Sequence, residues 1–317
     1  MKILISGGAG FIGSHLVDFY LRQGEEVWCV DNFLTGRREN IVSHSKFNLF
    51  HFLEEDICKL DVDKLPGDFS LVVHLASPAS PPDYLQYPVE TMRTNSLGTE
   101  KMLELAGICK CRFLFASTSE VYGDPEIPVQ DETYWGHVNP VGPRAVYDEA
   151  KRYGEALVMT YHRYYGVNTC IARIFNTYGP GMRINDGRVI PNFIRQALTG
   201  QVLTVYGDGN QTRSFCYVDD LIRGLVALVD SEEHCPVNLG NPEEFSILQL
   251  VKELERIMGM RLKMEFKPLP EDDPKRRKPD ISRATRLLHW KPVVCLEEGL
   301  KKTVDYFRDK LNKKGER

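Results

Sequence analysis

Short apolar runs alternate with longer stretches of helical periodicity through the first half of the chain. The apolar runs predict six strands, at residues 2–6, 26–30, 50–53, 71–75, 113–118 and 169–173. Between the strands, apolar residues recur every three to four positions, as they do after Phe11 and again from Ala150 to Tyr161. Strands that alternate with helices in this way indicate βαβ units and a parallel sheet.

The alternation loosens after Tyr178, where glycine and proline become frequent. Short strands are mixed there with helices predicted at residues 190–198, 221–228, 247–258 and 296–311. We therefore expect two lobes. The first consists of residues 1–177 with about 213–239, and the second, a smaller α/β lobe, consists of about 178–212 and 240–317.

The composition excludes several classes of function. The 317 residues are 42% hydrophobic and 26% charged, as in a soluble globular protein, and a net charge of −4 gives no footprint for nucleic acid or an anionic membrane. No apolar run approaches the ~20 residues of a membrane helix, and Gly7 and Gly8 break the first run too early for a signal peptide. Of eight scattered cysteines, only Cys109 and Cys111 are close, and no second pair completes a zinc site. We expect buried reduced thiols, no metal and a cytoplasmic location.

Three glycines, Gly7, Gly10 and Gly13, follow the first predicted strand. Without side chains they let the backbone approach a pyrophosphate and let the next helix pack close to the strand. That helix begins near Phe11 and Ile12 and directs its N-terminal amides at the phosphates. Because a strand precedes the glycines and an amphipathic helix follows them, the sequence predicts a dinucleotide site in a Rossmann-type, doubly wound α/β sheet.

Asp31 stands at the end of the second predicted strand. A carboxylate there accepts hydrogen bonds from the adenosine ribose and repels a 2′-phosphate, which favours NAD over NADP. Arg37 and Arg38 are close by in the sequence and offer the opposite possibility, a cradle for that phosphate. We give Asp31 more weight and expect NAD.

Tyr147 and Lys151 are four residues apart in a stretch of helical periodicity, so they lie side by side on one helix face. A phenol titrates at about 10, and acting as a base near neutrality requires a shift of about three units, or roughly 4 kcal/mol. An ammonium about 4 Å away, at an effective dielectric of about 20, is worth roughly as much. The pair is therefore suited to a tyrosine base assisted by lysine, although the same spacing arises by chance in many helices.

Thr118 and its neighbouring serines follow the fifth predicted strand, upstream of this pair. With the glycine motif, these residues resemble the extended short-chain dehydrogenase/reductase family of nucleotide-sugar enzymes over nearly the whole chain. The resemblance implies that Thr118, Tyr147 and Lys151 are catalytic, that the first lobe binds NAD, and that the second binds the sugar nucleotide. It also implies a homodimer that pairs the helix of Tyr147 with the helix after Asn95.

The same resemblance implies the residues around each ligand. Those expected at the cofactor are Gly7, Gly10, Phe11, Ile12, Gly13, Asp31, Asn32, Gly36, Asp56, Ile57, Leu75, Ala76, Ser77, Asn95, Tyr147 and Lys151. Those expected at the substrate are Arg188 and Arg213 for the diphosphate, Asn176 for a phosphate, Tyr206 for the uracil, and Tyr84 and Arg277. His74, in an apolar strand, is interpreted as a core histidine.

Ser119 and Glu120, directly after Thr118, distinguish between branches of this family. A 4,6-dehydratase needs an acid and a base at these positions, and a serine protonates a leaving hydroxyl poorly. A 4-epimerase normally has neutral residues, among which Glu120 is out of place. Ser-Glu matches the UDP-glucuronic acid decarboxylases. The segments that agree with them include residues 77–82, 186–188, 203–209, 211–215 and 276–280.

The resemblance therefore implies NAD-dependent conversion of UDP-glucuronate to UDP-xylose. Oxidation at C4 makes the C6 carboxylate a β-keto acid, which loses carbon dioxide readily, and Thr118 and Tyr147 would stabilise the C4 oxygen. Glu120, with Ser119 beside it, would orient the sugar or relay a proton. Arg277 would receive the carboxylate.

Alternatives remain at two levels. For Arg277, the plain alternative is a solvated run of four cations from Lys275 to Lys278. For the chain, the alternatives are a dTDP- or UDP-glucose 4,6-dehydratase, a nucleotide-sugar 4-epimerase, and an NAD-binding scaffold without catalysis.

Overall fold

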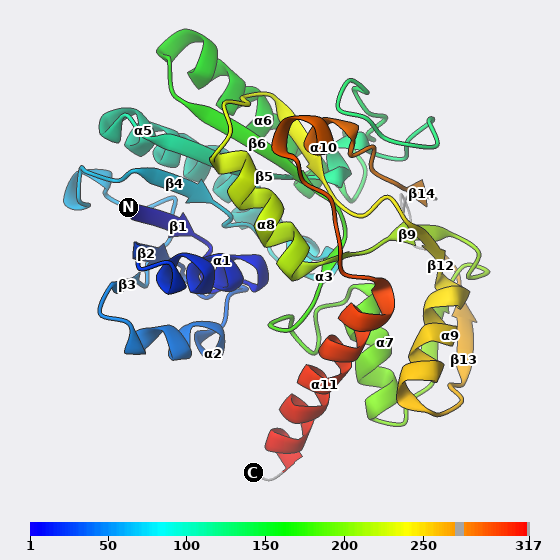
Figure 1. Ribbon diagram of the computed structural model, residues 1–317. Coiled ribbons are helices and arrows are strands. Elements are labelled where there is room, and N and C mark those ends of the chain that lie inside the picture. Colours follow the sequence, from blue (N-terminus) through cyan, green and yellow to red (C-terminus); the bar gives the residue numbers. More distant parts are fainter. Residues whose placement is uncertain (270–275, 316–317) are drawn as a thin grey trace.

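The computed structural model describes residues 1–269 and 276–315, and its centre is a seven-stranded sheet in which all neighbouring strands are parallel (Figure 1). The order across the sheet is β11 (Pro236–Leu239), β6 (Thr169–Ile174), β5 (Arg112–Thr118), β4 (Leu71–His74), β1 (Lys2–Ser6), β2 (Glu26–Val30) and β3 (Phe50–Leu53). The order reverses between β1 and β4, and ligands of such sheets bind at that point, beyond the carboxyl ends of the strands. The predicted Rossmann-type sheet is confirmed.

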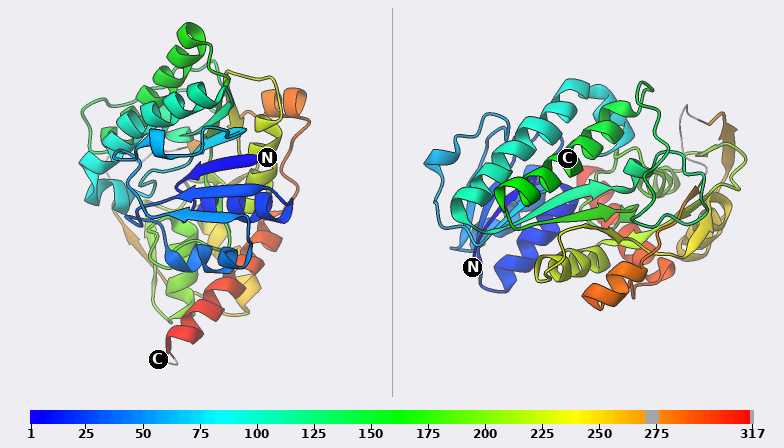
Figure 2. Two further views of the ribbon diagram at one scale, coloured as in Figure 1. Left: turned by 90° about the vertical axis from the view of Figure 1, so that its left-hand side faces the viewer. Right: turned by 90° about the horizontal axis from the view of Figure 1, so that it is seen from above.

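Helices cover both faces of the sheet (Figure 2). They are α1 (Phe11–Arg22) and α8 (Val218–Val229) on one face, and α5 (Thr99–Cys109) and α6 (Ala145–Tyr165) on the other. Alternate residues of a strand point to opposite faces. In β1, Ile3 and Ile5 therefore belong to the apolar cluster that contains α1 and α8, whereas Leu4 belongs to the cluster that contains α5 and α6. All three side chains are fully buried, which fixes the sheet between its two helical layers.

The remaining elements surround this core. The other helices are α2 (Arg38–Ile41), α3 (Pro81–Gln86), α4 (Pro88–Arg93), α7 (Val189–Leu198), α9 (Ile247–Met258), α10 (Ser282–Leu288) and α11 (Leu296–Gly315). Single turns of 3-10 or π helix are η1 (Val42–Lys46), η2 (Val62–Lys64), η3 (Thr94–Gly98) and η4 (Ser119–Tyr122). The short strands are β7 (Thr177–Tyr178), β8 (Leu203–Tyr206), β9 (Thr212–Ser214), β10 (Cys216–Tyr217), β12 (Glu244–Ser246), β13 (Met264–Lys267) and β14 (Arg276–Arg277).

The short strands form small sheets outside the central one: β10 with β7, β13 with β8, and β12-β9-β14. Helices α7, α9 and α11 gather beside two of these sheets, on the side of the molecule that carries the C-terminus (Figure 1). The boundaries given above for two lobes stay a prediction.

The predicted elements agree closely with the structure. Strands β1, β2 and β3 have the predicted bounds, and β4 ends one residue early, at His74. Helix α9 also has its predicted bounds, because Ser246 caps its N-terminus and Gly259, with a φ of +65°, ends it. Helix α8 begins at Val218, three residues before the predicted start. Acidic residues in its first turn interrupt the apolar pattern but favour the helix N-terminus.

His74 is a core residue, as predicted. It is 1% exposed, and its ring nitrogens lie 2.7 Å from the Ser6 hydroxyl and 3.2 Å from the Thr94 carbonyl oxygen. Burial, together with the charge of Lys151, lowers the pKa of His74 to about 3. The imidazole is therefore neutral at physiological pH.

All eight cysteines are free. The prediction that they are buried is wrong for Cys235 and Cys295, which are exposed because both lie in connections between elements. Residues 1–269 and 276–315 include no helix with the length and apolar character needed to cross a membrane. The same residues include no group of three or more His, Cys, Asp or Glu side chains placed to hold a metal ion.

Candidate active site

The glycine loop lies at the carboxyl end of β1. Gly7 has a φ of +75°, and a Cβ there would lie 2.6 Å from the backbone of Ala76, so only glycine fits. A Cβ on Gly13 would overlap the Gly7 carbonyl oxygen. The missing side chains let α1, which begins with Phe11 and Ile12, start directly against the strand. This is the geometry that a pyrophosphate needs at a helix N-terminus.

Asp31 is held at the end of β2 by backbone amides. Its carboxylate accepts hydrogen bonds from the Ala9 amide at 3.0 Å and the Phe33 amide at 2.8 Å. Burial raises the pKa of this carboxyl, and the two amides oppose the rise. The Asp31 carboxylate is therefore fixed at the end of β2, where a carboxylate favours NAD over NADP.

Arg37 and Arg38 have partners of their own. Arg37 forms an ion pair with Glu39, and Arg38 forms one with Glu54 at 2.6 Å. Two arginines already compensated by carboxylates make a weak cradle for a 2′-phosphate. The structure thus supports NAD over NADP.

A cleft opens at the carboxyl ends of β1, β2 and β4. Its lining includes the predicted cofactor residues Gly7, Gly10, Asp31, Asn32, Gly36, Asp56, Ile57, Leu75, Ala76 and Ser77. Asn95, fully buried, donates from Nδ2 to the Ser77 hydroxyl and to the Thr91 carbonyl, both at 2.9 Å. Its Oδ1 has no hydrogen-bond partner within the described part of the chain, so it can accept from a ligand or a water at this end of the cleft. The cleft therefore fits a dinucleotide.

Tyr147 and Lys151 share one face of α6, as their spacing predicts. They are 6% and 3% exposed, and the Lys151 Nζ lies 5.8 Å from the centroid of the Tyr147 ring. The Lys151 ammonium donates to the Ala116 carbonyl of β5 at 2.8 Å. Thr118, at the end of the same strand, lies close enough to Tyr147 for its hydroxyl to lower the pKa of the phenol. The structure thus brings Thr118, Tyr147 and Lys151 together.

Burial opposes the effect that Lys151 is expected to have on the tyrosine. It raises the pKa of Tyr147 above its usual range, and Thr118 and the charge of Arg188 offset only part of that rise. Burial also lowers the pKa of Lys151 to about 7. The lowering of the tyrosine pKa by lysine, to which a cationic nicotinamide would add, stays a prediction.

Glu120 lies between two arginines. Its Oε2 accepts from Arg144 at 2.5 Å and from Arg277 at 2.6 Å, and Arg277 also donates to the Ser119 carbonyl. Burial raises the pKa of Glu120, but the guanidinium groups of Arg277 and Arg144 outweigh it and hold the pKa below its usual range. Glu120 is therefore ionised near neutral pH.

Arg277 is not part of a solvated basic run. Its side chain is 2% exposed, and the next residue, Lys278, pairs with Glu244 at 3.0 Å. Lys275 lies outside the described residues. The alternative offered for Arg277 is thus wrong, whereas its role toward a substrate carboxylate stays a prediction.

Sequence analysis missed two charged residues of this cluster. Arg144 directly precedes α6, three positions before Tyr147. Asp148 follows Tyr147, and burial and then the charge of Glu120 raise its pKa to about 7. The Asp148 Oδ1 is buried and lacks a hydrogen-bond partner among residues 1–269 and 276–315. Arg144 could have been found, because positions 144, 147 and 151 share one helical face.

Two expected substrate residues lie close to Tyr147. Tyr84 stacks on its ring, with centroids 5.1 Å apart and planes 7° apart. The Tyr84 hydroxyl is buried without a hydrogen-bond partner in the part of the chain that the structure describes. Arg188 binds both carboxylate oxygens of Asp186, at 2.5 and 2.8 Å, and its charge acts on Tyr147. Both expected substrate residues therefore lie beside Tyr147.

The other expected substrate residues are spread more widely. Arg213 of β9 stands opposite Arg277 of β14, and its charge acts on Glu120. Asn176 is partly buried between β6 and β7. Tyr206 ends β8 and is 44% exposed. The roles of these residues stay predictions.

The fold and the site define a dinucleotide-binding α/β protein with a tyrosine–lysine pair beside its cofactor cleft. The model of the NAD dependent epimerase/dehydratase family matches residues 3–240. The chain therefore belongs to this family, within the extended short-chain dehydrogenases/reductases.

Relatives of known activity match almost the whole chain. UDP-glucuronic acid decarboxylase 1 of Xenopus tropicalis is 53% identical over 313 residues, which are 98% of this chain and 73% of that protein. UDP-glucuronic acid decarboxylase 3 of Arabidopsis thaliana is 48% identical over 316 residues, 98% of this chain and 90% of that protein. The solved structure of UDP-glucuronic acid 4-epimerase from Bacillus cereus with UDP-glucuronic acid and NAD is 34% identical. It has a TM-score of 0.88, and the match covers 98% of this chain and 99% of that one.

Proposed function

We propose that this chain is an NAD-dependent UDP-glucuronate decarboxylase that forms UDP-xylose and carbon dioxide. The observation that carries the proposal is Glu120, held as a carboxylate between Arg144 and Arg277 close to Tyr147. The similarity to UDP-glucuronic acid decarboxylases over 98% of the chain supports it. The cleft residues and the family both support NAD as the cofactor.

The reacting groups follow from the geometry around Tyr147. The glycine loop and Asp31 would hold NAD, which when bound would supply the hydride acceptor, and later the hydride donor, for C4 of the sugar. Tyr147 takes the proton of the C4 hydroxyl as a phenolate, and Thr118 beside it would hold the C4 oxygen. The charges of Arg188 and Lys151 and the positive nicotinamide of bound NAD would favour the phenolate against burial. The resulting 4-ketone makes the C6 carboxylate a β-keto acid, which loses carbon dioxide. Tyr147, now protonated, and Thr118 donate to the oxygen of the enolate that remains. C5 of the enolate then takes a proton from solvent water, and when the hydride returns to C4, Tyr147 gives its proton back to the C4 oxygen.

In this scheme Glu120 orients the sugar and does not act as a proton donor. Its lowered pKa leaves the carboxylate ionised, and an ionised carboxylate is a poor acid. Arg144 and Arg277 both bind this carboxylate, and Arg213 also acts on it. Arg277 is proposed to bind the substrate carboxylate as well, because a guanidinium can donate to two carboxylates.

Product analysis tests this function. Mass spectrometry should find UDP-xylose and carbon dioxide from UDP-glucuronate, and no conversion of UDP-glucose. Arg277→Ala should lower kcat/KM for UDP-glucuronate at least about ten-fold, the equivalent of a charge-assisted contact of about 1.5–3 kcal/mol. The matched control is Lys278→Ala, since Lys278 pairs with Glu244 and not with Glu120. A 4-keto-6-deoxy sugar from UDP- or dTDP-glucose, with UDP-glucuronate unchanged, would contradict the decarboxylase.

A 4-epimerase acting on UDP-glucuronate is the second candidate. The observation in its favour is the likeness, at 34% identity, to the UDP-glucuronic acid 4-epimerase of Bacillus cereus. The same assay separates the two activities. An epimerase returns an isomeric UDP-uronic acid of unchanged mass and releases no carbon dioxide.

We also propose that the chain forms a homodimer through α5 and α6, which lie side by side on the surface (Figure 1). Large exposed apolar side chains gather on α4, η3, α5 and α6: Val89, Met92, Leu97, Ile108, Tyr153, Tyr164 and Tyr165. Such a surface is typical of an interface. Analytical ultracentrifugation should show a dimer that Tyr153→Glu dissociates, whereas Met260→Glu, on an exposed residue after α9, should leave it intact. A wild-type monomer at micromolar concentration would contradict the proposal.

A cytoplasmic location is proposed on the same footing. The eight free cysteines support it, because a reducing compartment keeps thiols unpaired. Fractionation of cells that express the tagged chain tests this proposal. Recovery of the tagged chain in the membrane or secreted fraction would contradict it.

A further inference from the structure

Three residues of α6, Tyr147, Lys151 and Glu155, follow one another at four-residue intervals on the helix face that meets β5. The Lys151 ammonium donates to the Ala116 carbonyl at 2.8 Å, and the Ser117 hydroxyl donates to Glu155 Oε1 at 2.5 Å. Helix and strand are thus joined by polar contacts at consecutive strand residues. Glu155 belongs to this row, although the reaction scheme gives it no part.

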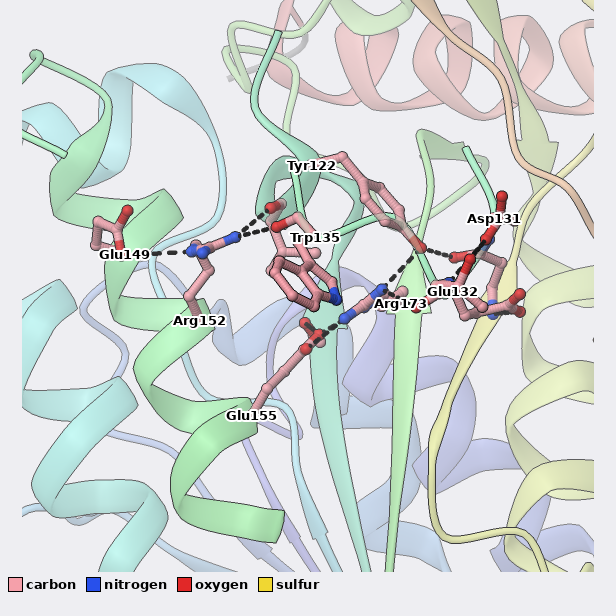
Figure 3. Close-up of polar contacts among 12 residues, drawn as sticks. Tyr122, Asp131, Glu132, Trp135, Glu149, Arg152, Glu155 and Arg173 are labelled. Carbon is pink, nitrogen blue, oxygen red and sulfur yellow. Dashed lines mark hydrogen bonds and ion pairs between the residues drawn. The ribbon is translucent and has the colours of Figure 1, made fainter. Parts of the chain in front are cut away.

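Glu155 is fixed from the neighbouring strand as well. Arg173 of β6 stands opposite Ser117 in the strand register and binds both carboxylate oxygens of Glu155, at 2.8 and 2.7 Å (Figure 3). Arg173 also donates to the Tyr122 hydroxyl at 2.9 Å, and this hydroxyl donates to Asn238 at 2.8 Å. The side chains of Glu155 and Arg173 are only 12% and 11% exposed. The carboxylate therefore has a single well-defined position.

The surroundings of Lys151 show why that position matters. His74 of β4 faces it as a neutral imidazole, and the Phe115 ring of β5 lies 5.0 Å from its Nζ. Tyr147 of α6 contributes its phenol ring, and Arg173 of β6 a cation already bound to Glu155. Burial disfavours the ammonium, and Glu155 is the acidic group that acts against this effect.

We propose that Glu155 is a positioning residue for Lys151. Fixed by Arg173 and Ser117, its carboxylate keeps the lysine side chain charged and in place beside Tyr147. The proposal rests on the proposed function, in which the Tyr147–Lys151 pair performs the proton transfer at C4. On this proposal the Arg173–Glu155 ion pair controls the Tyr147–Lys151 pair and also holds α6 against β6.

Two substitutions that break the same ion pair should act in opposite directions. Glu155→Gln removes the negative charge and leaves the Arg173 cation, so the pKa of Lys151 should fall by about one unit. Arg173→Met removes the cation and leaves the carboxylate, so the pKa of Lys151 should rise by a similar amount. The conservative Glu155→Asp keeps the charge and should restore a titration close to that of the wild type.

The primary measurement is a pH titration of the lysine side-chain nitrogens by NMR, on the full chain saturated with NAD. The Lys151 signal is identified by its loss in Lys151→Met. In the decarboxylation assay, the alkaline limb of kcat should move to lower pH in Glu155→Gln and to higher pH in Arg173→Met, with KM for UDP-glucuronate unchanged. The sign follows because the ammonium is lost as pH rises through its pKa.

Shifts in opposite directions support the proposal. Shifts in the same direction, or none, overturn it, because a purely structural ion pair affects both variants alike. If Glu155→Gln does not fold, the other two variants decide. An unchanged pKa of Lys151 in Arg173→Met overturns the proposal, and so does a lowered pKa of Lys151 in Glu155→Asp. Opposite NMR shifts in a protein that makes no UDP-xylose would reject the proposed function and leave the positioning role intact.

Discussion

Buried charge is concentrated in a few residues near the carboxyl end of β5. Glu120 is compensated by two arginines, whereas Asp148, also buried, has one carboxylate oxygen without a hydrogen-bond partner in residues 1–269 and 276–315. Burial away from water costs free energy for both carboxyl groups, and only Glu120 has ion pairs that offset this cost. An uncompensated carboxyl retained at such a place is typical of a functional site.

Tyr147→Phe should lower turnover at least ~100-fold, because it removes the group that accepts the C4 proton. The affinity for NAD, measured by fluorescence titration, should stay near that of the wild type, since the glycine loop is untouched. Tyr161→Phe, on the same helix and outside the site, is the matched control. Near-normal turnover in Tyr147→Phe would mean that another group accepts the proton.

Asp148→Asn should stabilise the protein at pH 8. The pKa of Asp148 is raised to about 7 in the folded chain, so folding is increasingly penalised as pH rises from the unfolded pKa of about 4 toward 7. The amide removes this penalty, and the gain should exceed about 1 kcal/mol above pH 7 and vanish below about pH 4. Urea unfolding of both proteins at the two pH values measures it. An equal effect at both values would contradict a raised pKa.

At the scale of elements, the site depends on how closely α6 approaches β5. The two elements touch at Gly154, where a Cβ would collide with the ring of Phe115. The contact sets the height of Tyr147 and Lys151 above the strand that ends in Thr118. A glycine inside a long helix costs stability by itself, so its presence here reflects the need for close packing.

Gly154→Ala should destabilise the protein by about 1–3 kcal/mol and reduce turnover, because the methyl group pushes α6 away from β5. Gly107→Ala in α5 is the matched control. A Cβ there meets only a Val167 methyl at 3.7 Å, so the better helix propensity of alanine should make it neutral or stabilising by about 0.5–1 kcal/mol. Thermal unfolding measures the change in stability of both variants. Similar behaviour of the two would refute the role assigned to the contact.

At the scale of the whole molecule, the cofactor cleft collects residues from the ends of β1, β2 and β4 and from the segment around Thr94. A ligand that binds these segments only when they are assembled stabilises the fold. The contacts at Asp31 and the ion pairs of Arg37 and Arg38 determine which dinucleotide does so.

NAD should therefore raise the melting temperature more than NADP at equal concentration. At 100 times its Kd, a ligand adds about 2.7 kcal/mol to the free energy of unfolding. Differential scanning fluorimetry with both cofactors measures the difference. Asp31→Ala should reduce the preference for NAD, and a larger shift with NADP in the wild type would contradict the assignment.

The sequence was most informative where structure is encoded locally. The bounds of β1, β2 and α9 follow from short apolar runs and caps, and the Tyr147–Lys151 spacing needs only helical periodicity. The contact between Glu120 and Arg277 spans 157 positions and depends on β14 pairing with β9, which no local pattern encodes. The burial that shifts the pKa values of Tyr147 and Lys151 likewise depends on contacts between distant segments, which no local pattern encodes.

The position of Arg277 in the chain also orders events during synthesis. The last strand of the central sheet, β11, ends at Leu239, so every strand of that sheet and every residue of the cofactor cleft is synthesised before Arg277. Until then Glu120 faces Arg144 without its second guanidinium partner. A nascent chain thus carries the groups that bind its cofactor before it carries the complete charge cluster, which is closed only once Arg277 has been synthesised.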